Sequence, residues 1–253
     1  MKGLPALLRV GGIALLAAFL AAPTAFEPVF APFTEFGQPA IYTQSSLSSL
    51  AFAHLLTVGA AAAASTAFAV ALGIFVTRPF GREFMPLSLS IASIGQTFPP
   101  VAVLAVAVPA VGFGEAPTLI ALFLYGLLPI LENTMAGLLQ VPASVVDAAQ
   151  GMGMDEAQRL WQVEMPLATP VILEGVRVSA VINLGTATIG STVAAKGLGE
   201  VIVAGLLSNN TAYILQGGLV VGLMAVLLYD GLQILERRIS RTLGTPSHAG
   251  DSP

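Results

Sequence analysis

The chain has 253 residues, of which 55% are hydrophobic and 9% are charged, and its mean hydropathy is +0.85. Because a soluble globular protein carries about 25% charged residues, this composition excludes a water-facing surface over most of the chain and predicts a membrane protein. The absence of cysteine excludes disulfides and thiolate metal sites. A net charge of −4 with scattered arginines gives no nucleic-acid-binding footprint.

The first apolar segment covers residues 1–22 and is interrupted by Arg9. The stretch after Arg9 has about the length of the hydrophobic region of a signal peptide. We interpret the segment as a first transmembrane helix, and cleavage of a signal-like segment, residues 1–25, is the alternative. Residues 23–48 contain four prolines and neither Lys nor Arg. They are predicted to be an exposed periplasmic connecting segment.

Five further apolar spans follow, each long enough to cross a hydrocarbon core about 30 Å thick. They lie near residues 50–77, 84–111, 116–139, 171–193 and 212–235. The fold class is therefore an all-α membrane protein, a polytopic bundle of about six transmembrane helices, or five if the first segment is cleaved. Its transmembrane domain covers residues 49–241, and residues 242–253 are predicted to form a disordered tail.

A polar loop at residues 140–166 separates the fourth and fifth of these crossings. When this loop is placed inside, alternation leaves only Lys196 outside. The positive-inside rule then predicts a cytoplasmic loop and a cytoplasmic C-terminus in the bacterial inner membrane. The cationic residues on the inner side are Lys2, Arg9, Arg78, Arg82, Arg159, Arg177, Arg237, Arg238 and Arg241.

The polar loop has local signals for two short helices outside the membrane. Ser144 and Asp147 are spaced like a capping box that begins the first helix. Gly151 can end that helix, and Gly153 tolerates a positive φ in the turn that follows. The two helices are predicted to form a docking knob for another protein.

The second short helix is predicted to begin at Asp155, a residue type that caps helix N-termini. It runs to Val163, and Pro166 is expected to stop it. The alternative to a docking knob is a loop that lies on the lipid surface with Trp161 in the headgroup layer.

The loop also contains a spaced motif: Asp147-Ala148-Ala149, three residues, Gly153, nine residues, and then Val163-Glu164-Met165-Pro166. This pattern resembles the EAA motif of ABC importer permeases, E-A-A-x3-G-x9-I-x-L-P, with conservative departures at three positions. The resemblance implies the type I importer permease fold and a coupling loop that sits in a groove of a cytoplasmic ATPase. The implied coupling residues are Asp147, Ala148, Ala149, Gly151, Gly153, Trp161 and Pro166.

The resemblance extends over roughly residues 50–240 and is strongest to the permeases for glycine betaine, choline and related osmoprotectants. It rests on the segments 94–99, 121–130, 133–134, 151–154, 163–167 and 197–199. Two positions depart from that pattern: Glu132 stands where a basic residue is expected, and Ala194-Ala195-Lys196 replaces a run of glycine and alanine. These departures leave the permease interpretation intact and weaken the assignment of the solute.

The resemblance implies three protein partners besides the lipid bilayer. They are the ATPase, a periplasmic or lipid-anchored substrate-binding protein, and a second permease subunit, identical or homologous. The expected cargo is glycine betaine or choline, with methionine, an aliphatic sulfonate or an ergothioneine-like thiol-imidazole as alternatives. An ion-coupled secondary carrier is the alternative from another functional class. Such a carrier would not co-purify with an ATPase.

No residues of the chain itself predict an enzyme. Neither lysine lies in a G-x-x-x-x-G-K-[ST] loop, so ATP and Mg²⁺ are expected on the partner ATPase and no cofactor on this chain. His54 and His248 are far apart in the sequence, which predicts no metal site.

The candidate solute passage centres on a break in the third crossing. Pro99 and Pro100 remove two backbone donors there, and broken backbone at membrane depth is tolerated only against protein or a water-filled cavity. The prediction is a passage at this break, and a packed kink is the alternative. The candidate pathway residues are Gln96, Thr97, Phe98, Pro99, Glu132, Asn133, Thr134, Asn183 and Thr186.

Alternative roles remain open for the polar members of this set. Asn183 and Thr186 could instead bond to a neighbouring helix, and Glu132 could pair with Arg177, which also lies three residues after Glu174. Aromatic residues are only 7% of the chain and its one tryptophan is in the loop. Since a quaternary ammonium is normally held by an aromatic cage, selectivity is predicted to lie mainly in the binding protein.

Overall fold

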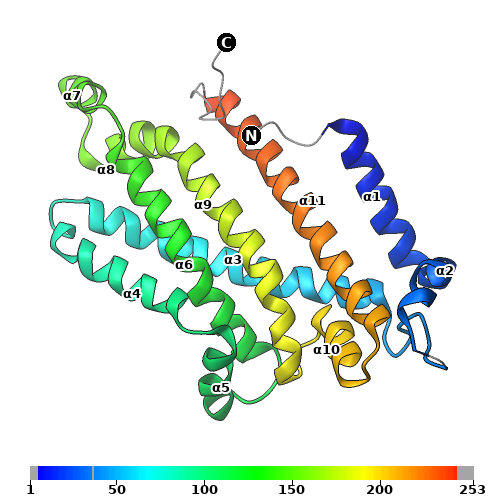
Figure 1. Ribbon diagram of the computed structural model, residues 1–253. Coiled ribbons are helices and arrows are strands. Elements are labelled where there is room, and N and C mark those ends of the chain that lie inside the picture. The colour runs from blue at the N-terminus through cyan, green and yellow to red at the C-terminus, as the bar shows by residue number, and fades with distance from the viewer. Residues whose placement is uncertain (1–4, 36, 244–253) are drawn as a thin grey trace.

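The computed structural model of the chain describes residues 5–35 and 37–243, and these form a bundle of helices (Figure 1). The α-helices are α1 (Ala6–Ala21), α2 (Glu27–Phe30), α3 (Leu47–Thr77), α4 (Met85–Thr97), α5 (Pro100–Val111), α6 (Glu115–Leu139), α7 (Ala143–Gly151), α8 (Glu156–Arg159), α9 (Met165–Thr186), α10 (Gly199–Leu207) and α11 (Thr211–Leu243). Shorter helical turns are Pro23–Phe26, Ala31–Phe33, Arg82–Phe84, Leu160–Glu164 and Ala187–Val193.

The described part of the chain contains four helices that are long and apolar enough to cross a membrane. They are α3, α6, α11 and a 38-residue helix over Glu156–Val193 that includes α9. Two bent pairs raise the number to as many as six, in agreement with the predicted bundle. These pairs are Ala6–Ala21 with Pro23–Phe33, bent by 111°, and Arg82–Thr97 with Pro100–Val111, bent by 96°.

Helix α6 lies at the centre of the bundle, where it packs against α3, α4, α5 and α9. Small residues permit this close approach. A side chain at Gly175 of α9 would place its Cβ 2.6 Å from the Pro129 carbonyl oxygen, and one at Gly73 of α3 would lie 2.6 Å from Thr134. Close backbone contact through small residues is the usual means of helix association where lipid removes the hydrophobic driving force.

The bundle has two distinct ends, which we call the loop end and the opposite end. At the loop end, residues 140–166 lie near the end of α3, because Arg78 pairs with Glu164. At the opposite end, the Glu115 carboxylate accepts hydrogen bonds from Thr57 Oγ1 at 2.9 Å and from the Lys196 backbone N–H at 3.0 Å. Helices α3 and α6 therefore run from the opposite end to the loop end, and α9 runs back.

The N-terminal helix α1 packs along α11 (Figure 1). Arg9 of α1 pairs with Asp230, whose side chain is 2% exposed. At the other end of α1, Phe19 contacts the rings of Phe26 and Phe30, with centroids 5.1 and 5.4 Å away. The first apolar segment is thus a helix integrated into the bundle.

The connection after α1, predicted to be an exposed segment at residues 23–48, is mostly exposed but contains one buried stretch. Ala40, Ile41 and Tyr42 are buried, because Gln216 of α11 holds this stretch: its amide oxygen accepts the Tyr42 N–H at 3.1 Å and its Nε2 donates to the Ala40 carbonyl at 2.7 Å. Prolines broke the apolar pattern in the sequence, but backbone groups of the segment are satisfied by a polar residue of a distant helix.

The opposite end also contains helix α10, which the apolar spans did not indicate. Gly199 begins this helix in a contact so close that a Cβ would lie 1.8 Å from the Thr188 carbonyl oxygen. Just before it, Ala194 has a φ of 64°, in the left-handed region that glycine prefers. The predicted departure from a glycine-containing run thus falls on a strained backbone position.

Candidate coupling site

The polar loop folds into two helical pieces joined by a turn, which we call the elbow (residues 142–164). Helix α7 begins at Ala143 after Pro142, and no side chain caps it. The capping box predicted at Ser144 and Asp147 is therefore wrong. Pro142 itself occupies the N-cap position, with a φ of −59° and a ψ of 134°, so Ser144 lies inside the first turn.

The turn of the elbow depends on Gly153, as the sequence predicts. Helix α7 ends at Gly151, and Gly153 has a φ of 82°. The Gly153 N–H donates to the Gln150 carbonyl at 2.9 Å, and the Met154 N–H donates to the Ala149 carbonyl at 3.2 Å. Since no atom lies within 4 Å of a Cβ built at Gly153, the constraint on this residue comes from its backbone alone.

Asp155 caps the second piece of the elbow, which confirms the sequence prediction. Its Oδ1 accepts the Gln158 N–H at 2.8 Å, and Gln158 Oε1 accepts the Asp155 N–H at 3.0 Å. This reciprocal capping box satisfies two donors that the helix start would otherwise leave unpaired. It fixes the point at which the chain leaves the turn.

The prediction that Pro166 stops the second helix is wrong. Helix α8 continues through a π-helical turn, Leu160–Glu164, directly into α9, where Pro166 occupies the first turn. The Met165 N–H donates to the Leu160 carbonyl five residues back. A π turn changes the hydrogen-bond register, and the missing N–H of Pro166 falls in the first turn after it, so the helix passes the proline without ending.

The elbow exposes a small-residue and apolar surface to the outside of the bundle. Asp147 and Ala148 are exposed, whereas Ala149 is buried against the chain. Met152 is 71% exposed and Trp161 is 63% exposed. We call Asp147, Ala148, Met152 and Trp161 the elbow surface. Large apolar side chains at such exposure mark a surface for protein or membrane contact.

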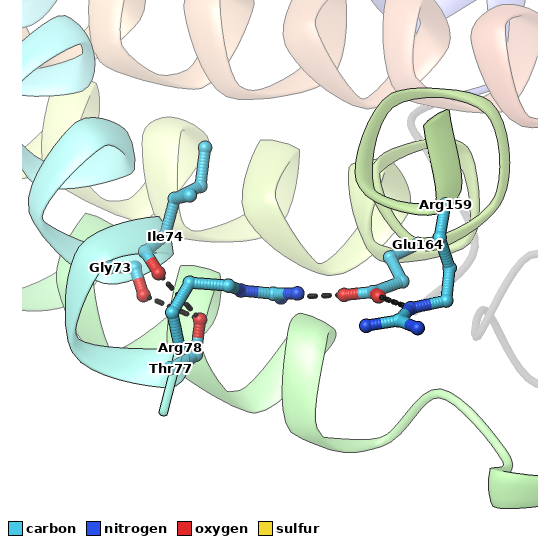
Figure 2. Close-up of polar contacts among 6 residues, drawn as sticks. All are labelled: Gly73, Ile74, Thr77, Arg78, Arg159 and Glu164. Carbon is cyan, nitrogen blue, oxygen red and sulfur yellow. Dashed lines mark hydrogen bonds and ion pairs between the residues drawn. The ribbon is translucent and has the colours of Figure 1, made fainter. Parts of the chain in front are cut away.

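The base of the elbow is joined to α3 by an ionic contact (Figure 2). Glu164 lies between two arginines: its Oε2 accepts Arg78 Nη2 at 2.5 Å and its Oε1 accepts Arg159 Nε at 3.1 Å. The Glu164 side chain is 6% exposed. Arg78 directly follows α3, whose last residue, Thr77, bonds back to the Gly73 and Ile74 carbonyls at 2.9 Å.

The predicted passage lies at the sharp bend between α4 and α5. Gln96 donates to the Tyr125 carbonyl at 3.0 Å, and the Tyr125 hydroxyl donates to the Phe98 carbonyl. These bonds tie the bend to α6 and satisfy a carbonyl near the prolines. Thr97, Phe98 and Pro99 remain exposed on the chain, which is compatible with a surface that faces a passage or a second subunit.

The other predicted pathway residues divide into exposed and buried groups. Glu132 is exposed on α6, and Asn133 and Thr186 are partly buried. Thr134 and Asn183 are fully buried and bond to the Ile130 and Leu122 carbonyls at 2.7 and 3.0 Å. In this structure the Asn183 bond joins α9 to α6, the Thr134 bond lies within α6, and neither side chain reaches the surface.

Arg177 of α9 pairs with Glu236 of α11, not with Glu132, and it lies over the ring of Tyr229. Its predicted contact with Glu174, three residues before it, is present at 3.5 Å. Sequence reasoning missed Glu236, which is 59 residues away. Within residues 5–35 and 37–243, no group of three or more His, Cys, Asp or Glu side chains is placed to hold a metal ion.

The elbow, the helix order and the bent pair can now be compared with known proteins. Residues 69–242 match the family of binding-protein-dependent transport system inner membrane components. The chain belongs to this family. It is therefore a multi-pass inner-membrane permease of the ABC importer class, and the predicted motif at residues 147–166 lies inside the matched region.

Relatives of this permease are osmoprotectant, carnitine and choline permeases by name. An osmoprotectant import permease protein of Salmonella typhimurium is 40% identical over 78% of this chain and 84% of its own. A carnitine transport permease protein of Listeria monocytogenes is 40% identical over 68% and 77%. A choline transport system permease protein of Bacillus subtilis is 36% identical over 68% and 82%.

Solved structures show the fold of the permease. An inward-facing structure of the MetNI methionine ABC transporter contains a chain that covers 78% of this one and 95% of its own length, with a TM-score of 0.64 and 21% identity. An amino acid ABC transporter with histidines aligns over 76% and 93%, with a TM-score of 0.63 and 16% identity. The predicted type I importer permease fold is confirmed.

Proposed function

We propose that this permease forms the membrane passage of an ATP-driven importer and that its elbow surface binds a cytoplasmic ATPase. The observation that supports this most directly is the exposed elbow surface, formed by the spaced motif around a glycine-dependent turn. The backbone is exposed at Ala148 because its side chain is a single methyl group, so a partner groove can approach closely. Met152 and Trp161 supply the apolar area.

The contribution of this chain to transport is mechanical. ATP and Mg²⁺ bind to the partner, and ATPase closure displaces the elbow. A second permease subunit, identical or homologous, completes the passage beside the exposed residues of the bend at Phe98 and Pro99. The lipid excludes water from the outer faces of the helices. A polar solute can therefore cross only where polar side chains lie beside a break in the helical backbone.

The orientation follows from the distribution of charge over the two ends. Arg78, Arg82 and Arg159 lie at the loop end, and Lys196 lies at the opposite end. The positive-inside rule therefore supports a cytoplasmic elbow. Helix α11 ends on the same side, which makes the C-terminus cytoplasmic, and a substrate-binding protein delivers solute to the opposite end.

The proposed cargo is a quaternary ammonium osmoprotectant such as glycine betaine or choline. The names of the relatives support this solute class. The chain has one tryptophan, Trp161, and it lies in the elbow rather than at the bend. Selectivity therefore rests mainly with the binding protein, and this chain offers a weakly binding path.

We also propose that the first helix is retained. Asp230 is buried in α11 and pairs with Arg9 of α1. Cleavage near residue 25 would remove this cation from an intramembrane carboxylate, which is costly in a bilayer. Blotting the N-terminally tagged chain in purified membranes tests this: a full-length product is expected, and loss of the tag with a shortened chain would contradict it.

The ATPase proposal is tested by site-specific cross-linking. Because the natural chain has no cysteine, Ala148→Cys introduces one thiol on the elbow surface, and Ser208→Cys provides a matched exposed thiol at the opposite end. Ala148→Cys is expected to cross-link to an ATPase and to be shielded from a membrane-impermeant reagent added outside cells. External labelling of Ala148→Cys, or purification without any ATPase, would overturn the proposal and favour an ion-coupled carrier.

The cargo is tested separately in proteoliposomes with the cognate binding protein. ATP is supplied in the compartment that holds the ATPase. Radiolabelled glycine betaine and choline are then expected to accumulate in that compartment, whereas methionine is not. Uptake of methionine or an aliphatic sulfonate in preference to both would overturn the assignment while leaving the permease function in place.

A further inference from the structure

We infer that Glu164 is a positioning residue for transport, the ionic joint through which the elbow moves α3 and α4. This inference rests on the proposed coupling of the elbow to an ATPase and names the route by which that motion reaches the bent span. It is built from the contacts of Glu164, Arg78 and Arg159 (Figure 2).

The chain connections alone would move only two helices. Residues 140–166 are joined covalently to α6 on one side and, through the π turn, to α9 on the other. Arg78, the residue after α3, lies 86 residues before Glu164 in the sequence, and the turn that it begins leads into α4. Displacement of the elbow therefore reaches the α3–α4 turn only through side-chain contacts.

Glu164 makes this contact with both of its carboxylate oxygens. One oxygen accepts Arg78, which directly follows α3, and the other accepts Arg159 in α8. The site thus holds two cations and one anion, and the anion prevents the two guanidinium groups from repelling each other. Charge-assisted bonds are stronger and more directional than neutral ones, and low exposure protects them from solvent screening.

The helix geometry aims Glu164 at this position. Glu164 is the last residue of the π turn Leu160–Glu164, and π turns inside α-helices are frequent at functional sites because they re-orient the side chains that follow. The Arg78 Nε is buried without a hydrogen-bond partner in the described residues, so the guanidinium depends on the Glu164 carboxylate for compensation of its charge. Breaking a buried ion pair on one side leaves an uncompensated charge, which is strongly unfavourable.

The route from the elbow ends at the predicted passage. Arg78 begins the turn between α3 and α4, and α4 leads to the 96° bend at Phe98 and Pro99. Apolar contacts run beside the joint, since Leu160, Met165 and Ile74 of α3 all pack against one buried apolar cluster that includes Ala168 and Ile172. Those contacts are non-directional and permit sliding, whereas the ionic joint fixes the register between the elbow and α3.

The test measures coupling in the full importer, reconstituted in liposomes with its ATPase and binding protein, with radiolabelled glycine betaine as the probe. Glu164→Gln removes the charge at nearly the same volume. It is expected to retain stimulated ATP hydrolysis within twofold while the ATP consumed per solute taken up rises about tenfold, a typical allosteric coupling. Glu164→Asp is expected to restore most of the coupling.

Glu174→Gln is the matched control, because Glu174 lies on the same helix, also pairs with an arginine, and is 51% exposed. Its ratio of ATP to solute is expected to equal that of the natural chain. If Glu164→Gln does not accumulate, the double variant Arg78→Gln/Glu164→Gln removes the pair without an unpaired charge between those two residues, and it is expected to be uncoupled. An unchanged ratio in Glu164→Gln or in Arg78→Gln/Glu164→Gln overturns the inference.

A second measurement does not need the ATPase. Spin labels at Glu83→Cys, in the α3–α4 turn, and Glu156→Cys, in the elbow, report the separation of the two elements in the purified permease; both positions are exposed. The distance distribution is expected to broaden in Glu164→Gln and to stay narrow in Glu174→Gln. Equal widths overturn the inference, whereas the absence of an ATPase partner with a broadened distribution would count against the proposed function only.

Discussion

The two ends of the bundle are built in opposite ways. At the opposite end, the chain is closed by backbone-level contacts, such as Gly199 against the Thr188 carbonyl and Gln216 against Tyr42. At the loop end, the elbow stands away from the helices, and neither Gly151 nor Gly153 would bring a Cβ within 4 Å of another atom. The region around α10 is thus closed by contacts within the chain, whereas the elbow surface is left uncovered by the described chain.

Polar chemistry differs between the ends in the same sense. At the opposite end, the Tyr42 hydroxyl and Ser45 Oγ both donate to Glu200 Oε1 at 2.6 Å. Burial and the neighbouring Glu200 raise the pKa of Tyr42 to about 12, so the hydroxyl stays protonated and the contact persists. At the loop end the corresponding contact is an ion pair between separate elements. Substitutions at the opposite end should therefore mainly lower the stability of the fold, whereas substitutions at the loop end should mainly affect the proposed coupling.

The largest expected effect is a loss of stability at the opposite end. Gly199→Ala would place a methyl group 1.8 Å from the Thr188 carbonyl oxygen, so the backbone must shift, at a cost of about 3 kcal/mol or more. Thermal unfolding in detergent should show a large loss of stability or no folded protein. Gly151→Ala in the elbow is the matched control and should change stability by less than about 0.5 kcal/mol. Similar losses in both would break the comparison.

The second prediction concerns the proposed coupling function of the elbow, at the loop end. Gly153→Val forces a β-branched residue to a φ of 82°, which costs about 1–2 kcal/mol or more locally. Insertion and abundance should remain normal, while the ratio of solute-stimulated ATP hydrolysis to solute uptake, measured in proteoliposomes, should rise. Gly153→Asn should retain coupling, because asparagine tolerates this backbone region. An unchanged amount of ATP hydrolysed per solute taken up in Gly153→Val would show that the turn is not part of coupling.

The third prediction asks whether the bend between the ends matters. Replacing Pro99 and Pro100 with alanine restores two backbone donors and should straighten the 96° break. Uptake should fall severalfold while the chain still inserts, measured with radiolabelled solute. Pro109→Ala, which alters a proline within α5, should have a smaller effect. If uptake is the same in all three proteins, the bend only serves packing.

The smallest predicted effect is a gain in stability at the opposite end. Ala194 has a φ of 64°, so Ala194→Gly should relieve strain and stabilise the permease by about 0.5–1 kcal/mol after the entropy of the unfolded glycine is deducted. Its thermal midpoint in detergent should rise. Ala195→Gly removes a buried methyl group and should lower the midpoint. The reverse order would mean that the left-handed residue carries no strain.

Much of this architecture could be predicted from local signals. Span length gave the bundle, the Asp155 cap and the Gly153 turn were both evident, and adjacent prolines placed the break at residues 98–100. These features depend on a few neighbouring residues. The proposed coupling residues were likewise recognised from one spaced motif.

Other features depended on contacts that the local pattern does not contain. Pro166 was expected to end a helix, but a π turn five residues long absorbs its missing donor. Helix α10 has nine residues and gives no spanning signal. Arg78 and Glu164 are 86 residues apart, so no window of sequence joins them. Thr134 and Asn183 were polar enough for a passage, yet both are buried, Thr134 where α6 approaches Gly73 of α3 and Asn183 where α9 contacts α6.

The continuous helical segment from Glu156 to Val193, which includes the π turn, has a consequence for the size of the motion that the proposed coupling requires. Its 38 residues extend roughly 55 Å at about 1.5 Å per residue. A rigid rod of that length acts as a lever: a tilt of about 5° moves its far tip by roughly 5 Å. With the proposed orientation and coupling, a displacement of only roughly 5 Å at the loop end would thus be enough to open or close a gap for a small solute at the opposite end.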